Sequence, residues 1–395
     1  MRRVAIYCIT ILIGILAPLM ALEIILRFLP VTDILDTQPV NQTSPYIHFR
    51  PNRDITFSKA WNFSILTRKH INNYGYMNDV DFSKGETTPL LVIIGDSYVE
   101  ATHVFNKDSM HGLLSNRVGR RGRVYGIGYS GTALSQYLAF AEFSRKEFSP
   151  NGMVFIIVGN DFDESLTKYG WGPGFHYFSP GDFSVTRIDW PGKTWAGFIV
   201  SQSALARYVR GNLSFDPTFL SWLWKGNTAK TSAEFVGNTR ANADQERLED
   251  SKAVVDNFLI KVPMWTGLAR DKVLFVIDGM RPSLYSPEGM DAAKGSYFDL
   301  MRQYFIGKSR QLGHAVVDMQ PVFERDYSMN KKRFEFEVDA HWNERGHQLV
   351  ADEIEKTSVF RAVFFKARAR VLLGANDRPI RGPVREFAAA VPGRE

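Results

Sequence analysis

Short apolar-rich runs recur along the middle of the chain, separated by longer amphipathic stretches. These runs cover residues 90–94, 124–125, 153–158, 272–278 and 314–318. Runs this short, with little polar alternation, are typical of strands buried on both faces. Intervening segments, such as residues 108–118, 241–262 and 344–354, have the length and pattern of helices. The alternation predicts right-handed crossovers and a three-layer α/β/α sandwich with a central parallel sheet.

The first residues of the chain follow a different pattern. Arg2 and Arg3 precede an uncharged apolar run at residues 4–22, which as a helix would be about 28 Å long, close to the hydrocarbon thickness of a bilayer. A cleavable signal has small residues at its cleavage site, whereas Leu19 lies two positions before Ala21. We therefore favour an uncleaved anchor over a signal peptide. Basic residues ahead of the run place the N-terminus in the cytoplasm.

These patterns divide the chain into four parts. Residues 1–30 form a cytoplasmic stub and transmembrane signal-anchor, and residues 31–70 form a linker with peripheral strands. The main domain spans residues 71–360, and the tail spans residues 361–395. We expect a single-pass protein of the cytoplasmic (inner) membrane, with its main domain in the periplasm or outside the cell.

An insertion at about residues 163–240 interrupts the main domain. It is rich in aromatic residues and punctuated by Gly and Pro, and it is too long and apolar for a plain loop. One interpretation is a cap or rim over a binding site, with aromatic faces suited to sugar rings or an acyl chain. The other is that these aromatics only bury the insertion against the sheet. The sequence leaves both open.

Charge is concentrated in the tail. The chain carries a net charge of +6, and its last 35 residues hold eight Lys or Arg against three acidic residues. A basic amphipathic helix touching anionic lipid or polysaccharide would explain this. We favour a last helix that packs on the domain, followed by disorder after Gly374. Nucleic acid is not an expected partner, because no basic groove interleaved with aromatics is apparent. Protein partners are not indicated.

Cysteine and histidine usage limits the possible chemistry. Cys8 is the only cysteine and lies inside the apolar N-terminal run, which excludes disulfides, a cysteine-built metal site and a thiol nucleophile outside the membrane. The eight histidines show no zinc-binding pair at helical spacing. No metal or other cofactor is expected. With 45% hydrophobic residues, the chain can build a packed core without cross-links.

Candidate chemistry begins where the first apolar run ends, at Gly95-Asp96-Ser97. Near the other end stand Asp339 and His341. A serine hydroxyl is a poor nucleophile until a base takes its proton, and the base needs a carboxylate to fix its tautomer. The tripeptide alone could be an ordinary turn in which Asp96 caps a helix. However, later strand ends are also followed by Gly, Ser, Asn and Asp, and ligands bind outside the carboxyl ends of parallel strands.

A dinucleotide site is excluded at the second strand end. Gly126, Gly128 and Gly131 look like a glycine-rich fingerprint. Their spacing is wrong, and no acidic residue follows the next strand as that motif requires.

With these pieces in order, the sequence resembles the SGNH (GDSL-type) hydrolase superfamily over residues 71–354. Ser97 matches its nucleophile, Gly131 its second-block glycine, Asn160 its third-block asparagine, and Asp339 with His341 its last block. The resemblance implies a flavodoxin-like fold, a Ser97–His341–Asp339 catalytic triad, and an oxyanion hole made by the N–H groups of Ser97 and Gly131 and the Asn160 amide. The segment 71–76 and the Asp-x-His-Trp-Asn pattern resemble a bacterial membrane-anchored branch.

Two positions depart from the family pattern. Val158 replaces the first glycine of the third block, which alters a packing position and leaves Asn160 in place. Asp339 and His341 are two apart, where many members have three. In a strand, residues two apart point to the same side, so Asp339 could support His341 there, whereas a tight turn would separate them.

The sequence thus predicts a serine esterase or O-acyltransferase that acts on O-acyl, most simply O-acetyl, groups of a cell-envelope or secreted carbohydrate. Water or a sugar hydroxyl could resolve the acyl-enzyme, and the sequence does not separate the two. One alternative is a lipase-like esterase acting on lipid acyl chains. Another is an inactive carbohydrate-binding module of the same fold.

Overall fold

The computed structural model describes residues 2–214, 235–242 and 244–365. Its centre is a five-stranded sheet of β3 (Leu90–Gly95), β4 (Arg123–Gly128), β5 (Gly152–Ile157), β10 (Val273–Ile277) and β11 (Ala315–Asp318). Every neighbouring pair is parallel, in the order β11-β10-β5-β3-β4. Numbered along the chain, this is the 2-1-3-4-5 order of flavodoxin-like folds. The predicted parallel sheet is confirmed.

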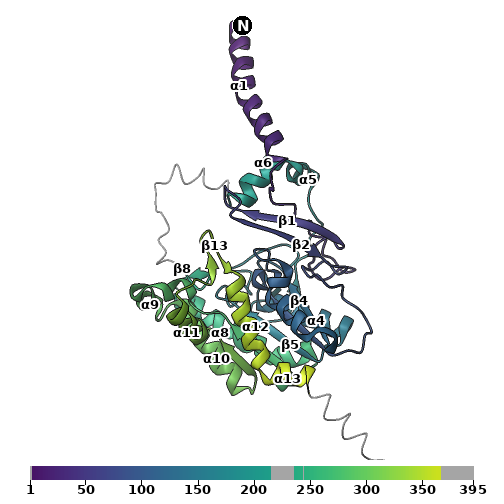
Figure 1. Cartoon of the computed structure of the whole chain (residues 1–395), viewed down its shortest axis with the longest axis vertical. Coiled ribbons are helices and arrows are strands. Elements are labelled where there is room, and N and C mark those ends of the chain that lie inside the picture. Colours follow the sequence, from purple (N-terminus) through teal and green to yellow (C-terminus); the bar gives the residue numbers. More distant parts are fainter. Residues whose placement is uncertain (1, 215–234, 243, 366–395) are drawn as a thin grey trace, which may run out of the picture.

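Helices cover both faces of the sheet and make three layers (Figure 1). Leu90, Val92 and Ile94 pack in one core with α4 (Leu134–Phe148), α8 (Gln245–Thr266) and α10 (Tyr297–Gln311). Leu91 and Ile93 face the opposite core, which contains α3 (Met110–Val118), α11 (Gln320–Asn330), α12 (Glu344–Lys356) and α13 (Ser358–Phe364). This division follows from the strand period of two, because successive side chains of β3 point to opposite faces. Both faces are apolar, so the strand reads as an uninterrupted apolar run.

Small antiparallel hairpins lie around the sheet. β1 (Arg53–Lys59) pairs with β2 (Ile65–Ile71), and β12 (Glu335–Phe336) pairs with β13 (Asp339–Trp342). The insertion adds β6 (His176–Phe178) with β7 (Val185–Arg187), and β8 (Phe235–Val236) with β9 (Thr239–Arg240). It also contains the short helices α5 (Trp195–Gln202) and α6 (Ala204–Arg207). Two further short helices are α2 (Ser97–Glu100) and α9 (Pro287–Ala293).

The insertion divides into a packed half and an exposed half. Tyr177 and Phe178 of β6 are buried, and Phe178 belongs to the core that contains α4. In contrast, no residue of α5 is buried. The interpretation that the insertion is buried against the domain therefore fits β6. It does not fit α5, whose side chains are not buried.

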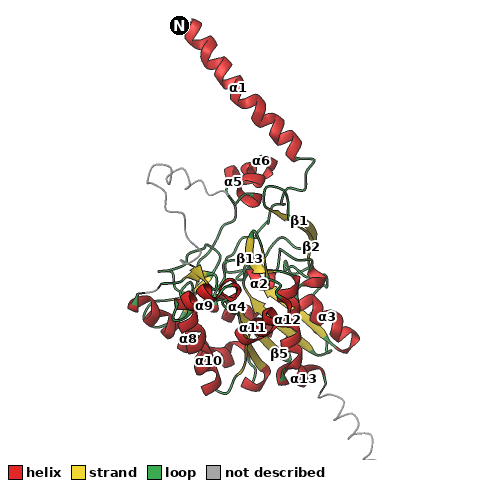
Figure 2. Ribbon diagram, turned by 60° about the vertical axis from the view of Figure 1, so that its left-hand side comes forward, coloured by secondary structure: helices red, strands yellow, loops and turns green. Residues whose placement is uncertain are grey.

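The first and last described helices lie at opposite ends of the domain (Figure 1). The helix α1 (Arg2–Leu26) extends away from the body in Figures 1 and 2. It is long and apolar enough to cross a membrane, and a signal sequence has the same properties. At the other end, α13 packs on the domain through Val359, Phe360 and Val363. The rest of the basic tail, residues 366–395, lies outside the described part of the chain, and so does the expected disorder after Gly374.

The carboxyl ends of the sheet strands face α1. At the amino end of the sheet, a Cβ on Gly152 would lie 2.8 Å from Val363 in α13. Figure 1 shows α13 at the end of the domain opposite to α1. The edge of the sheet where ligands bind in such folds is therefore the edge nearer to α1.

Candidate active site

Ser97 lies on the turn between β3 and α2, next to the end of the neighbouring strand β4. β3 is fully buried and ends at Gly95, and Asp96 then caps α2 by accepting a hydrogen bond from the Tyr98 N–H at 3.0 Å. This cap makes Ser97 the first residue of the helix. A Cβ on Gly128, at the end of the neighbouring strand β4, would lie 2.8 Å from the Asp96 carbonyl oxygen. Glycine at 128 thus lets the serine turn sit directly on the sheet edge.

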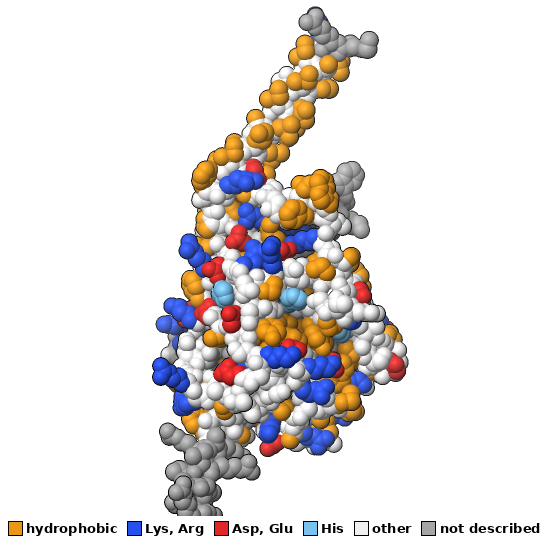
Figure 3. Space-filling view, turned by 90° about the vertical axis from the view of Figure 1, so that its right-hand side faces the viewer, with side chains coloured by type: hydrophobic (Ala, Val, Ile, Leu, Met, Phe, Trp, Pro, Cys, Tyr) orange, Lys and Arg blue, Asp and Glu red, His pale blue; other side chains and the backbone are white. Residues whose placement is uncertain are grey.

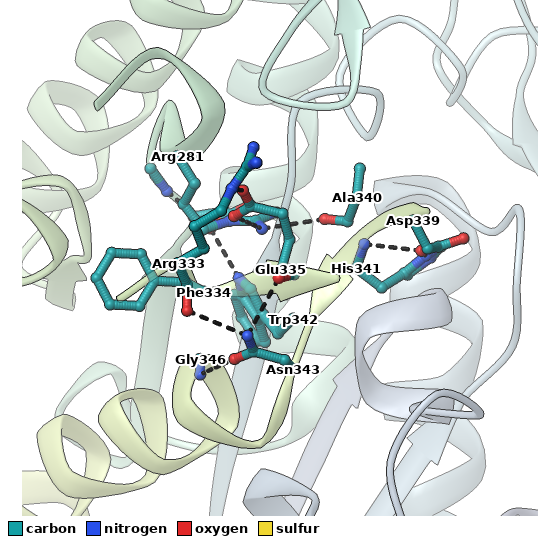
Figure 4. A network of polar contacts seen from close by, with 12 residues as sticks. Arg281, Arg333, Phe334, Glu335, Asp339, Ala340, His341, Trp342, Asn343 and Gly346 are labelled. Carbon is teal, nitrogen blue, oxygen red and sulfur yellow. Dashed lines mark hydrogen bonds and ion pairs between the residues drawn. The ribbon is translucent and has the colours of Figure 1, made fainter. Parts of the chain in front are cut away.

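His341 and Asp339 reach Ser97 from β13. The His341 Nε2 atom lies 2.7 Å from the Ser97 Oγ, and its Nδ1 lies 2.5 Å from the Asp339 Oδ1. The same carboxylate oxygen accepts the His341 backbone N–H at 2.9 Å. Because residues 339–342 form a strand, the Asp-x-His spacing directs both side chains to one side. Figure 4 shows this pair beside the polar contacts of the same hairpin.

Two residues that the sequence analysis did not select contact Asp339. The Lys59 ammonium, at the end of β1, pairs with its Oδ2. The His103 Nε2 lies 3.3 Å from the same oxygen, and the His103 ring stacks on His341 with centroids 4.3 Å apart and planes 15° apart. Burial lowers the pKa of His103 to about 4, so the ring is neutral near pH 7.

The charge of Asp339 is strongly stabilised. Burial alone opposes its ionisation, but the adjacent His103 imidazole and the hydrogen bond from His341 outweigh burial and hold the pKa of Asp339 far below the ordinary value. An ionised Asp339 fixes the tautomer in which His341 Nδ1 carries hydrogen and Nε2 faces the serine. The same three side chains could hold a metal ion by their spacing. The Lys59 ammonium on Asp339 opposes a second cation at that carboxylate.

A buried ionic network supports the hairpin from behind. Arg281 binds Asp278 through two nitrogens, with Nε 3.0 Å from Oδ1 and Nη2 2.9 Å from Oδ2. Asp278 directly follows β10 and also accepts the Trp342 indole N–H at 3.0 Å. Arg281 donates to the Ala340 carbonyl oxygen at 3.0 Å, as Figure 4 shows. Through these contacts, the end of a central strand positions the residues on both sides of His341.

The network also reaches the serine side. Arg281 Nη2 donates to the Tyr98 hydroxyl at 2.7 Å, and this hydroxyl donates to Ala340 at 3.2 Å. Glu335 of β12 is a second carboxylate beside the guanidinium, with its Oε2 3.5 Å from Arg281 Nη1. Burial works against the charged guanidinium, but Asp278 and Glu335 keep the pKa of Arg281 above its usual range. Tyr98 therefore links the helix that begins at Ser97 to the strand that carries His341.

The segments after β3, β4 and β5 contain the candidate oxyanion donors. Within the described residues, the N–H groups of Ser97 and Gly131 have no hydrogen-bond partner. Gly131 has a φ of +80°, a conformation that glycine adopts without strain. The preceding N–H, of Ser130, donates to Glu100 at 2.6 Å, and this holds the loop beside α2. Burial raises the pKa of Glu100 to about 7.

Asn160 follows β5 and is held on both sides of its amide. Its Nδ2 donates to Glu164 at 2.7 Å, and its Oδ1 accepts from the Asn238 amide at 2.8 Å. The side-chain amide has two N–H groups, so one remains for a substrate oxygen. Asn238 lies in the β8–β9 turn of the insertion, and no motif in the sequence pointed to it. A Cβ on Gly159 would lie 1.8 Å from the Gly237 carbonyl oxygen, so glycine at 159 allows this turn to pack against the Asn160 loop.

Comparisons with known proteins were made for the whole chain. No family model and no curated protein matches it. Similar solved structures include GDSL-type hydrolases and acetyl esterases. A putative GDSL-like lipase from Parabacteroides merdae is 12% identical, with a TM-score of 0.39, and the match covers 69% of this chain and 98% of that one.

Two further structures give similar values. A member of the lipolytic G-D-S-L family from Veillonella parvula is 10% identical over 69% of this chain and 98% of its own, with a TM-score of 0.35. A mutant acetyl-xylooligosaccharide esterase from Geobacillus is 11% identical over 72% and 98%, with a TM-score of 0.35. At TM-scores this low, the likeness adds no weight to the fold and the site, which rest on the strand order and contacts of this chain.

Proposed function

We propose that the protein is a serine esterase or O-acyltransferase of the SGNH type. Its proposed substrate is an O-acyl, most simply O-acetyl, group on a cell-envelope or secreted carbohydrate. The observation that carries the proposal is the hydrogen-bonded series from the Ser97 Oγ through His341 to Asp339, with distances of 2.7 and 2.5 Å. A serine, an imidazole and a buried carboxylate in this order are the parts that nucleophilic acyl transfer requires.

In the proposed reaction, the Ser97 Oγ attacks the ester carbonyl carbon while His341 Nε2 accepts its proton. The tetrahedral oxyanion is stabilised by the N–H groups of Ser97 and Gly131 and by the Asn160 amide. As the intermediate collapses, His341 returns the proton to the departing sugar oxygen, which leaves an acyl-serine. Water or a second hydroxyl then attacks this ester, again with His341 as base. The choice between these two nucleophiles distinguishes hydrolase from transferase.

We also propose that α1 remains as a membrane anchor, with the catalytic domain on the far side of the cytoplasmic membrane. The basic residues before the apolar helix support this orientation. Glu23 and Arg27 form an ion pair with a separation of 2.8 Å near its end, where the helix would leave the bilayer. A substrate in the cell envelope is consistent with this location.

Labelling the full chain with a fluorophosphonate probe tests the nucleophile. The probe should modify Ser97, and Ser97→Ala should abolish labelling and lower kcat by about 10⁶-fold. Ser328→Ala is a matched control, because Ser328 is an exposed serine in α11. An unlabelled Ser97 in folded protein would support an inactive binding module instead.

The oxyanion donors and the acyl group need separate tests. Asn160→Ala should lower kcat roughly 10²- to 10³-fold without abolishing labelling. A series of sugar esters with increasing acyl length should show a steep loss beyond acetyl. Undiminished activity on long chains would favour the lipase-like alternative. Adding an acceptor sugar during turnover, and measuring free acetate against acylated sugar, separates hydrolysis from transfer.

A further inference from the structure

The helix α5 exposes large apolar side chains between Trp195 and Val200. It contains eight residues, Trp195–Gln202, and none is buried. Trp195 is 79% exposed, Phe198 54% and Val200 58%. Single exposed apolar residues are common on soluble proteins, but a contiguous apolar surface marks an interaction site.

Polar contacts hold this apolar helix next to the end of α1. Glu23 of α1 accepts hydrogen bonds from the Ser203 hydroxyl at 2.8 Å and from the N–H groups of Ala204 and Leu205 at 3.0 and 2.8 Å. These N–H groups belong to the first turn of α6, which directly follows α5. Leu26 of α1 and Ala204 of α6 also belong to one buried apolar cluster, which strengthens the contact between these two helices. Figure 2 shows α5 and α6 at the end of α1 nearer the domain, and Figure 3 shows hydrophobic side chains gathered there.

Side chains around α5 have the chemistry found at a membrane interface. Trp195 begins the helix, and aromatic residues of this kind are enriched where headgroups meet water. Lys193, Arg207 and Arg210 line a cavity of about 800 Å³ beside it, together with Asp33 and apolar residues such as Val200. Asp33 pairs with Arg207, and Asp36 pairs with Lys193. No ion pair of Arg210 is seen among the described residues. Cations next to an apolar surface suit anionic lipid headgroups above acyl chains.

The strand β1 connects this region to the candidate catalytic site, because its last two residues contact both. Ser58 of β1 donates to the Pro30 carbonyl oxygen at 2.5 Å, shortly after α1 ends. The next residue, Lys59, contacts Asp339 of the proposed triad. Asn212, which follows α6, donates to the Ser58 hydroxyl at 2.8 Å. A fixed position of α5 and α1 on a bilayer would therefore fix the height and orientation of the serine edge as well.

We infer that α5 lies in the headgroup region of the same bilayer that α1 crosses, as a second membrane contact. The inference rests on the proposed anchoring by α1. Its physical basis is that α6 holds the exposed apolar helix α5 beside the end of α1, where burial in lipid would remove these side chains from water. The catalytic edge then faces the membrane surface, so substrates at or near that surface reach Ser97.

Depth-dependent fluorescence quenching in vesicles tests this. The full chain with Cys8→Ser and Phe198→Cys is labelled with an environment-sensitive dye and placed in phosphatidylcholine and phosphatidylglycerol vesicles that carry nitroxide lipids. The dye at position 198 should lose most of its emission to nitroxides near the headgroups and much less to nitroxides deep in the bilayer. The matched control is Ile260→Cys in the same background, because Ile260 is 69% exposed on α8, away from α1. It should remain unquenched.

The native Cys8 separates this inference from the anchoring on which it rests. With the dye on Cys8 of the otherwise unchanged chain, deep nitroxides should quench strongly. Quenching at position 8 with none at position 198 overturns the inference and leaves the anchor. No quenching at either position overturns both. A shielded dye at 198 that no nitroxide quenches means that protein covers α5, and this also overturns it. Fluorophosphonate labelling of Ser97 in each variant checks that the domain is folded.

Discussion

Ser97 and His341 contact each other, but the two structural elements that support them, β3 and β13, differ strongly. Ser97 follows β3, whose side chains are apolar and fully buried between β4 and β5 in the middle of the sheet. His341 lies on β13, which among the described residues pairs with the two-residue strand β12 and lies outside the central sheet. Nonpolar packing positions the first support, and a buried ionic network centred on Arg281 positions the second.

The difference matters because the two kinds of support respond differently to change. Hydrophobic burial has no direction, so a core tolerates small apolar substitutions with modest cost. A buried polar network depends on the direction of each hydrogen bond, and losing one member leaves the others unpaired. We therefore expect the histidine side of the site to be the more vulnerable one.

Among the residues that position Ser97 and His341, the largest expected effect comes from Asp339. Asp339→Asn keeps the size of the side chain but presents an amide, which favours the wrong His341 tautomer. We expect kcat to fall about 10⁴-fold, measured by ester hydrolysis at neutral pH. Asp352→Asn is the control, since Asp352 of α12 pairs with Arg117 of α3, away from the candidate site. Near-normal activity in Asp339→Asn would mean that His341 is oriented by its other neighbours.

The same contrast explains how much the sequence could predict. The apolar runs gave the parallel sheet, because strands buried on both faces leave a direct signal in hydrophobicity. The Asp-x-His spacing allowed a strand, and residues 339–342 form one. Lys59, His103 and Arg281 escaped prediction. Lys59 pairs with a residue 280 positions away, and no local pattern records such a contact. Its segment also looked like a linker. Asn238 was hidden for the same reason, since its partner lies in another loop.

A pair of core substitutions tests the comparison directly. Arg281→Met removes the cation that Asp278 and Glu335 share, and leaving buried carboxylates unpaired should lower the free energy of unfolding by about 3–5 kcal/mol. Ile94→Val in β3 should cost only about 0.5–1.5 kcal/mol. Urea denaturation of both variants measures these values.

Activity of the folded fraction completes this test. Arg281→Met should lower kcat at least about tenfold, because a hydrogen bond from a charged donor to the strand of His341 is lost. Ile94→Val should leave kcat close to that of the unchanged protein. Equal losses in the two variants would show that the serine and histidine sides are equally sensitive, and the contrast would not hold.

A smaller effect is expected at His103, where the two supports meet. His103→Phe keeps an aromatic ring against His341 but removes the nitrogen near Asp339, and we expect kcat to fall about tenfold at neutral pH. The substitution should also change the acid response of stability. Burial holds the pKa of His103 at about 4, below the value of 6.5 for an ordinary histidine. Between these values the unfolded chain binds a proton that the folded chain does not, so the unchanged protein loses stability as pH falls. His103→Phe should lose less over the same interval in urea denaturation at pH 7, 6, 5 and 4. Parallel curves would mean that His103 binds its proton over the same pH range in the folded and unfolded chains. Other buried histidines remain in both proteins, so the difference between the curves isolates His103.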